Sequence, residues 1–185
     1  MAKRIDPIAR EYEDPITDDH LRAIGRIIVR WSMTERVVMD SLWEVATGHS
    51  FGPTYGPEVG VSLALVTGMS TRVAMGILRA VFRARHPSGG NELDRIADKL
   101  DKLGKVRDVV AHGRWTAGRR PGSIEAASFI SSRKLGVRIH GFTAKELDAT
   151  ADRIKEETWN LATFLQKHGY WKPIEPPGPS PLPTP

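Results

Sequence analysis

The sequence predicts an all-α protein, an up-and-down bundle of about four main helices with a small β-hairpin inserted between the third and the fourth. Apolar residues recur in steps of three and four over residues 18–47, 58–85, 91–112 and 144–168, which is the spacing of one buried helix face. Between the last two stretches the pattern changes to turn residues and alternating faces. A chain of 185 residues is long enough for one domain with a sizeable core.

Composition limits the class of protein. Apolar residues make up 40% and charged residues 26% of the chain, an ordinary balance for a globular protein. Because the sequence has no cysteine, metal-ligand cluster, P-loop or dinucleotide fingerprint, we expect no metal and no other cofactor. No apolar run approaches the ~20 residues of a membrane span, and the first residues are unlike a secretory signal. We therefore expect a soluble, cytoplasmic protein without a membrane partner.

The chain divides into three parts. Residues 1–16 are polar, contain two prolines and lack a clear period, so we expect an N-terminal arm. Residues 17–170 form the predicted helical domain. Residues 171–185 are rich in proline, so we expect an extended, disordered tail there.

Local signals predict where the helices begin and end. Thr17 is a candidate N-cap for the first helix, Ser70 for a bend or restart within the second stretch, and Asn91 for the third helix. The residues 143–146, Thr-Ala-Lys-Glu, form a capping box for the fourth helix. Gly169 is suited to end that helix.

One carboxylate interrupts the apolar stripe of the first helix. Glu35 falls in line with seven apolar residues of that stripe, namely Leu21, Ile24, Ile28, Trp31, Val38, Leu42 and Val45. Arg107 falls at the centre of the apolar face of the third helix. Because unpaired burial of either charge is costly, we expect Glu35 to pair with Arg107 or to line the same cleft. The alternative is that the stripe reaches the surface at Glu35.

The segment from Lys105 to Trp115 contains the end of the third helix and the candidate functional residues Arg107, Asp108 and His112. A guanidinium cannot lose its proton, so Arg107 is either paired inside the bundle or faces a cleft that admits water or an anion. His112 lies about 140° from Arg107 around an ideal helix, and the two side chains converge only if the helix distorts or ends there. Asp108 lies four residues before His112 and could orient the imidazole. The alternative is an ordinary helix end with no chemistry.

The string Arg107-Asp108-x-x-x-His112-Gly, in a four-helix context of this size, resembles the Arg-x4–6-His motif of the HEPN superfamily. The superfamily commonly has Asn where this chain has Asp108. The resemblance implies a small all-α domain and a metal-independent endoribonuclease, although some members keep the fold and do not cut RNA. It further implies a homodimer whose two motifs share one cleft, and an antitoxin or regulatory protein as a possible partner.

Basic residues are concentrated after the motif. We predict a two-stranded hairpin at about residues 123–140, and the segment 113–141 holds one acid, Glu125, against six basic residues, Arg114, Arg119, Arg120, Arg133, Lys134 and Arg138. These cations are placed where RNA phosphates would need them. Trp115 either stacks on a base or covers the core. A second basic ridge, formed by Arg72, Arg79 and Arg83, either tracks phosphates or is simply solvated.

The favoured function is RNA cleavage of the HEPN type through attack by the substrate's own 2′-OH. His112 would move the proton, Arg107 would hold the scissile phosphate, Asp108 would orient His112, and Glu35 would position Arg107. Two alternatives stay open. The first is a catalytically inactive helical module that dimerises or binds a protein, and the second is nucleotide or RNA binding without chemistry.

Overall fold

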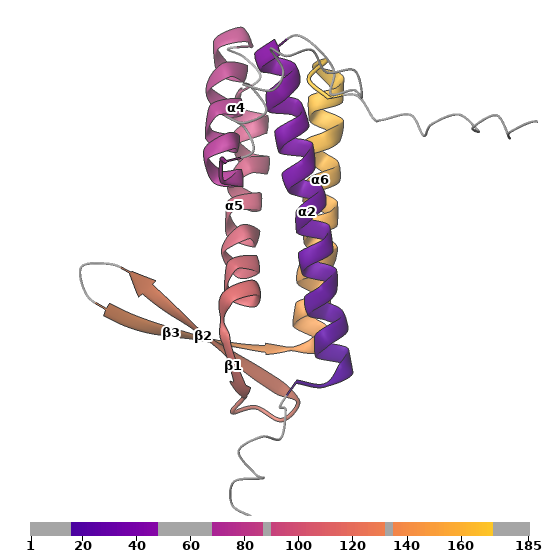
Figure 1. The fold of residues 1–185 in the computed structure, drawn as a ribbon. Helices are drawn as coiled ribbons and strands as arrows, with labels where there is room; N and C mark the ends of the chain where they lie inside the picture. Colours follow the sequence, from indigo (N-terminus) through magenta and orange to yellow (C-terminus); the bar gives the residue numbers. More distant parts are fainter. Residues whose placement is uncertain (1–15, 48–67, 87–89, 132–134, 172–185) are drawn as a thin grey trace, which may run out of the picture. The chain divides into compact units, whose positions relative to one another are not determined.

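The computed structural model describes residues 16–47, 68–86, 90–131 and 135–171 (Figure 1). Within these ranges the chain forms four helices and a three-stranded antiparallel sheet, so the predicted all-α fold with a small β insertion is confirmed. The helices and strands, in chain order, are α2 (Asp18–Thr47), α4 (Thr71–Arg85), α5 (Gly90–His112), β1 (Arg114–Ala117), β2 (Ser123–Ser131), β3 (Leu135–Thr143) and α6 (Ala144–Lys167). The predicted arm and proline-rich tail lie almost entirely outside the described residues.

Most helix ends follow the capping signals. The Ser70 side chain accepts a hydrogen bond from the Val73 amide at the start of α4. At the start of α6, the Glu146 amide donates to Thr143 Oγ1 over 3.2 Å and the Thr143 amide donates to Glu146 Oε2 over 2.7 Å, which confirms the capping box. Gly169 ends α6 with a φ of 75°, the left-handed conformation that favours glycine. Helix α5 begins at Gly90, one residue before the predicted cap.

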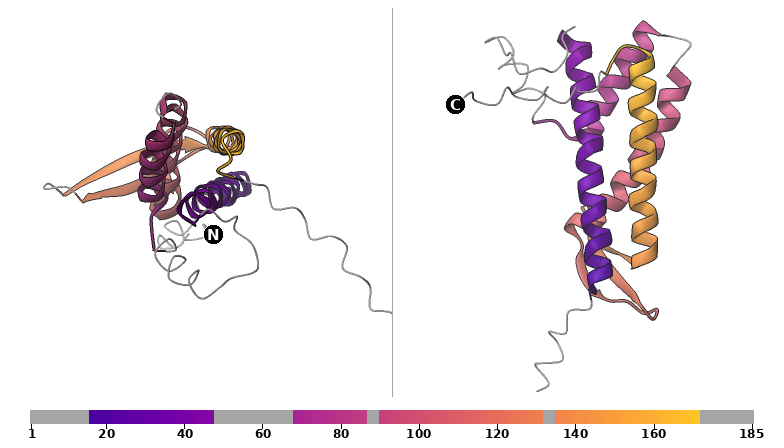
Figure 2. Two further views of the ribbon diagram at one scale, coloured as in Figure 1. Left: turned by 90° about the horizontal axis from the view of Figure 1, so that it is seen from above. Right: turned by 90° about the vertical axis from the view of Figure 1, so that its right-hand side faces the viewer.

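The sheet has one strand more than predicted. Strands β2 and β3 form the expected hairpin, and β1 adds along the other side of β2, pairing Arg114 with Ala127 and Ala117 with Ile124. With four residues directly after a helix, β1 is too short to show the alternation by which strands are recognised in a sequence. It covers only one end of the longer hairpin, which continues beyond it as a two-stranded ribbon (Figure 1, Figure 2).

The chain forms two compact units, and the boundaries between them fall within helices α2, α5 and α6. Unit 1 comprises Met1–Thr34 and Arg95–Thr158, and it contains the sheet. Unit 2 comprises Glu35–Asp94 and Trp159–Pro185, and it contains α4. Within the described residues, no helix is long and apolar enough to cross a membrane.

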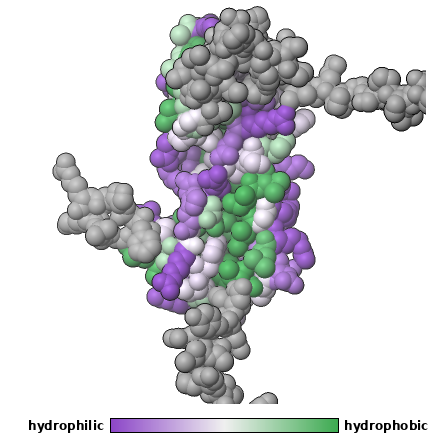
Figure 3. Space-filling view, in the orientation of Figure 1, coloured by the Kyte–Doolittle hydropathy of each residue, from purple (hydrophilic) through white to green (hydrophobic). Residues whose placement is uncertain are grey.

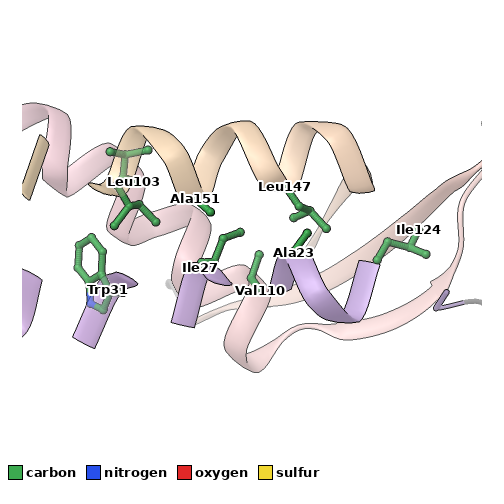
Figure 4. Packing of buried hydrophobic residues seen from close by; sticks show 9 residues of the cluster. Ala23, Ile27, Trp31, Leu103, Val110, Ile124, Leu147 and Ala151 are labelled. Atoms are coloured by element: carbon green, nitrogen blue, oxygen red, sulfur yellow. The ribbon is translucent and has the colours of Figure 1, made fainter. Parts of the chain in front are cut away.

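In unit 1, the core joins α2, α5, α6 and the sheet (Figure 4). Its buried members are Ala23, Ile27, Trp31, Leu103, Val110, Ile124, Leu147, Ala151 and Ile154. Ion pairs border this core, because Arg26 and Arg30 of α2 bind Asp152 of α6 over 2.9 and 2.6 Å. The Arg30 hydrogen bond is the main reason why the pKa of Asp152 is lowered. Apolar burial and the ion pairs thus fix α2 beside α6 within this unit.

In unit 2, the predicted basic ridge is partly neutralised. The Arg79 guanidinium lies 2.7 Å from Asp94 Oδ1, and Arg83 binds the other oxygen of the same carboxylate. Together these arginines, Arg83 most of all, lower the pKa of Asp94. Two of the three ridge arginines therefore bind an acid, which favours the structural interpretation of the ridge.

The prediction for the buried face of α2 was wrong at two positions. Leu21 and Ile28 are 51% and 37% exposed, although both were expected to lie in the core. The buried apolar residues of α2 in unit 1 are Ala23, Ile27 and Trp31. Of these, Trp31 belongs to the predicted stripe, whereas Ala23 and Ile27 lie beside it. Helix α2 thus has two apolar faces, and one of them faces solvent in this chain.

Candidate functional site

Arg107 lies half-buried against an aromatic ring. Its side chain is 24% exposed, and its guanidinium carbon lies 6.0 Å from the centre of the Trp31 ring, within the range of a cation–π contact. Gly104 lies one turn earlier on the same face of α5, and a Cβ there would come within 2.8 Å of the Trp31 ring. The indole therefore packs closely against the α5 backbone at Gly104 and contacts Arg107 one turn further on.

Asp108 contacts the arginine and not the histidine. The Arg107 Nη1 atom donates to Asp108 Oδ1 over 3.1 Å, and the Asp108 side chain is 61% exposed. Among the described residues, no hydrogen bond joins Asp108 to His112 although the two are four residues apart. The geometry thus assigns Asp108 to holding Arg107, whereas the sequence suggested that it orients the imidazole.

His112 lies exposed in the last turn of α5. The helix runs without a break from Arg107 through His112, so the two side chains keep the separation of about 140° that an ideal helix gives them. The helix is not distorted between Arg107 and His112, so the two side chains are not brought together. Within one chain, the cation and the imidazole point in different directions.

Gly113 directly follows the last residue of α5. Its φ is not positive, since among the described residues only Gly122 and Gly169 have positive φ. A Cβ at Gly113 would lie 2.4 Å from the Val109 carbonyl oxygen and 2.9 Å from the Ala126 Cβ. Glycine is therefore required because a Cβ would clash both with the last turn of α5 and with Ala126 of β2. The close contact with β2 fixes the last helical turn and His112 relative to the sheet.

Glu35 belongs to unit 2, whereas Arg107 belongs to unit 1. Glu35 is half-buried, and its Oε1 accepts a hydrogen bond from Thr71 Oγ1 over 3.2 Å. The expected pairing of Glu35 with Arg107 stays a prediction.

The basic residues after the motif do not gather on one surface. Cross-strand partners share a face of a sheet, and neighbours along a strand alternate. The register therefore places Arg114, opposite Ala127, on one face and Arg138, opposite Ser128, on the other. Both arginines are exposed. Arg133 and Lys134 lie outside the described residues.

The turn between β1 and β2 carries two further arginines with different surroundings. Arg119 is 85% exposed near Glu125. Arg120 lies 3.3 Å from Glu146 at the start of α6, and it also donates to the Gly141 carbonyl. Arg119 is thus the more accessible of the two to a phosphate.

Trp115 covers the core of unit 1. It is half-buried, packs against the buried cluster, and its ring centre lies 6.1 Å from that of Phe142. This position favours the structural interpretation of Trp115 over base stacking. The aromatic residue that contacts the candidate site is Trp31, which the sequence indicated only as a core residue. The signal available in the sequence was the small Gly104 one turn before Arg107, which leaves space for a large ring.

Comparison of the chain with protein families, with curated proteins and with solved structures gave no significant match. The features of this chain that bear on its function are therefore the geometry of Arg107, Asp108, His112 and Trp31 and the motif in its sequence.

Proposed function

We propose that this protein is a metal-independent endoribonuclease of the HEPN type. The observation that carries the proposal is the arrangement at the end of α5, where a half-buried cation and an exposed imidazole follow one another at the spacing of the Arg-x4–6-His motif. Supporting features are the contact of Arg107 with Trp31 and its bond to Asp108, which together restrict the guanidinium. A restricted cation stabilises developing charge better than a mobile one, because it needs little reorganisation during the reaction.

The proposed reaction is an attack of the ribose 2′-oxygen on the neighbouring phosphorus, with loss of the 5′-oxygen of the next nucleotide. His112 would accept the 2′-OH proton or protonate the leaving oxygen. Arg107 would bind the non-bridging phosphate oxygens, and Asp108 would position Arg107. The products would be a 2′,3′-cyclic phosphate and a 5′-OH. DNA lacks the 2′-OH and would not be cut.

Because α5 separates Arg107 and His112 by about 140°, we propose that a second copy of the chain completes the site. Helix α2 carries a solvent-facing apolar stripe, which we define by Leu21, Ile28, Val29 and Met33, with exposures of 51%, 37%, 65% and 53%. Apolar residues gather on this face in Figure 3. Gly25 lies within the stripe, and a Cβ there would meet nothing within 4 Å. An exposed glycine in a helix is destabilising by ~0.5–1 kcal/mol relative to alanine, and close packing of a second helix would explain it.

The dimer makes a specific prediction for Val29. The Val29→Glu variant places a charge in the apolar stripe and is expected to sediment as a monomer, because burial of an unpaired carboxylate opposes association. Ala149→Glu introduces the same charge at an exposed position of α6 and should leave the dimer intact. Sedimentation velocity measures both. A wild-type protein that is monomeric and fully active as a nuclease would contradict the shared site.

The nuclease proposal is tested by RNA cleavage in EDTA with analysis of the product ends. Wild type is expected to cut and to leave cyclic phosphates, and His112→Ala is expected to lose about 10²–10⁴-fold in rate, the usual contribution of a general acid or base. His140→Ala removes a histidine of β3 that has no assigned role, and should cut like wild type. Equal cleavage by the His112→Ala variant would exclude this histidine from the chemistry.

A catalytically inactive module is the second candidate. The observation in its favour is that Arg107 is already engaged by Trp31 and Asp108 while His112 points elsewhere on α5. Under this alternative, neither the wild type nor the His112→Ala variant cuts any structured or unstructured RNA.

A further inference from the structure

A cluster of five rings joins the ends of α4 and α6 in unit 2. We call it the histidine cluster and define it by Phe82, His86, Phe164, His168 and Tyr170. The His86 ring stacks on Phe82 with centres 4.7 Å apart, and the His168 ring lies 4.7 Å from Phe164 and 5.0 Å from Phe82. The two imidazole centres are 5.4 Å apart. Two titratable rings therefore share one aromatic environment.

Tyr170 ties the chain after α6 to the end of α4. Its hydroxyl lies 2.8 Å from His86 Nε2, its amide donates to the Leu165 carbonyl over 2.8 Å, and its side chain is 7% exposed. His86 is itself fixed as the C-cap of α4, where its amide donates to the Phe82 carbonyl. The hydrogen bond between the two side chains thus connects the ends of two helices.

The charges around the cluster oppose a second proton. His86 and the adjacent Arg85 lie at the end of α4, Lys167 on α6, and Glu92 on α5. Burial lowers the pKa of His168 most, His86 and Lys167 lower it further, and Glu92 raises it. A single imidazolium can be stabilised by the faces of the phenylalanine rings and by the Tyr170 oxygen. Two imidazoliums at this distance repel one another in a partly dehydrated site.

We propose that His86, His168 and Tyr170 form a proton-sensitive latch, which holds residues 168–171 against the end of α4 at neutral pH and opens when both imidazoles are protonated. The latch is independent of the nuclease proposal, because it lies in unit 2 and involves none of the residues assigned to RNA cleavage. Because the pKa of His168 is lowered in the folded protein, the latch loses stability as the pH falls. The contribution of the latch to stability is complete above the ordinary histidine value of 6.5, and it is lost as the pH falls below that value.

The coupling between the two rings is tested by following the histidine C2 protons by NMR during a pH titration. In His86→Phe, the apparent pKa of His168 is expected to rise, because its cationic neighbour is gone. Phenylalanine preserves the aromatic packing. His140→Phe serves as the matched control and should leave the titration of His168 unchanged. An unchanged titration of His168 in the folded His86→Phe variant would overturn the proposal.

Opening of the latch is tested by amide hydrogen exchange, corrected for the intrinsic pH dependence of the chemistry. In wild type, protection of the Tyr170 amide is expected to fall at least about tenfold between about pH 7.5 and 5, because the lowered pKa of His168 links its protonation to opening. His168→Phe should remove this loss. If that variant does not fold, His168→Gln replaces the histidine by a side chain that is also uncharged but is polar at its end. An equal loss of protection in wild type and in the folded variant would overturn the latch.

Discussion

Replacing Arg107 by alanine is expected to lower kcat/KM for RNA cleavage by about 10²–10³-fold, the usual cost of removing one group that stabilises transition-state charge. The guanidinium contacts Trp31 and Asp108, so it is held in one place before the substrate binds. Its loss should reduce kcat more than it raises KM, because the developing charge on the phosphate is greatest in the transition state. Single-turnover cleavage of a defined RNA measures the effect on the chemical step.

Two further variants separate the role of Arg107 from that of positive charge in general. Arg107→Lys keeps the charge but loses the planar guanidinium, which can donate two hydrogen bonds to one phosphate. Its cleavage rate should therefore lie between those of Arg107→Ala and wild type. Arg114→Ala removes an exposed arginine seven residues later in β1, and its effect should be small and should disappear at high salt. If Arg107→Ala cut RNA as fast as wild type while remaining folded, Arg107 would have no place in the chemistry.

Replacing Phe82 by alanine is expected to reduce the free energy of unfolding by about 3–5 kcal/mol, the usual cost of removing a fully buried phenyl ring. Phe82 is 1% exposed and contacts four other rings, those of His86, Phe164, His168 and Tyr170. The alanine variant would leave a cavity among these rings that their neighbours can fill only in part. Urea denaturation followed by circular dichroism gives the difference directly.

The matched variant is Phe82→Leu, which keeps most of the apolar volume. Its cost should stay below that of alanine by at least about 1 kcal/mol, since a smaller cavity remains. A loss of less than about 1 kcal/mol in Phe82→Ala would show that the ring cluster contributes little to stability. An unfolding curve with two steps would show that the units do not unfold together, and each step would then be analysed separately.

The parts of the fold that the sequence predicted well depend on local chemistry. The capping box at residues 143–146, the Ser70 cap and the end of α6 at Gly169 all involve groups within a few residues of one another, so the signal and the structure lie in the same short segment. The hairpin of β2 and β3 was also visible, because its turn and its alternation are local.

The features that were missed depend on which distant residues meet. The apolar pattern of α2 fits two faces, and only its tertiary partners decide that Ile27 is buried while Leu21 is exposed. Similarly, the spacing of Asp108 allowed a contact with either Arg107 or His112, and the folded chain selects Arg107. The contact of Trp31 with Arg107 joins two helices that are far apart in sequence, so no local pattern predicts it.

The position of β3 at the edge of the sheet also has a consequence for aggregation. Strand β2 lies between β1 and β3, and among the described residues the outer edge of β3 has no neighbouring strand. Val137 and Ile139 are more than half exposed on that strand, so it offers both backbone groups and apolar side chains to any passing strand. Arg138 lies between them, and a charge in such a position hinders aggregation through strand edges. The charge of Arg138 is thus expected to oppose pairing of the β3 edge with another strand, independently of any contact with RNA.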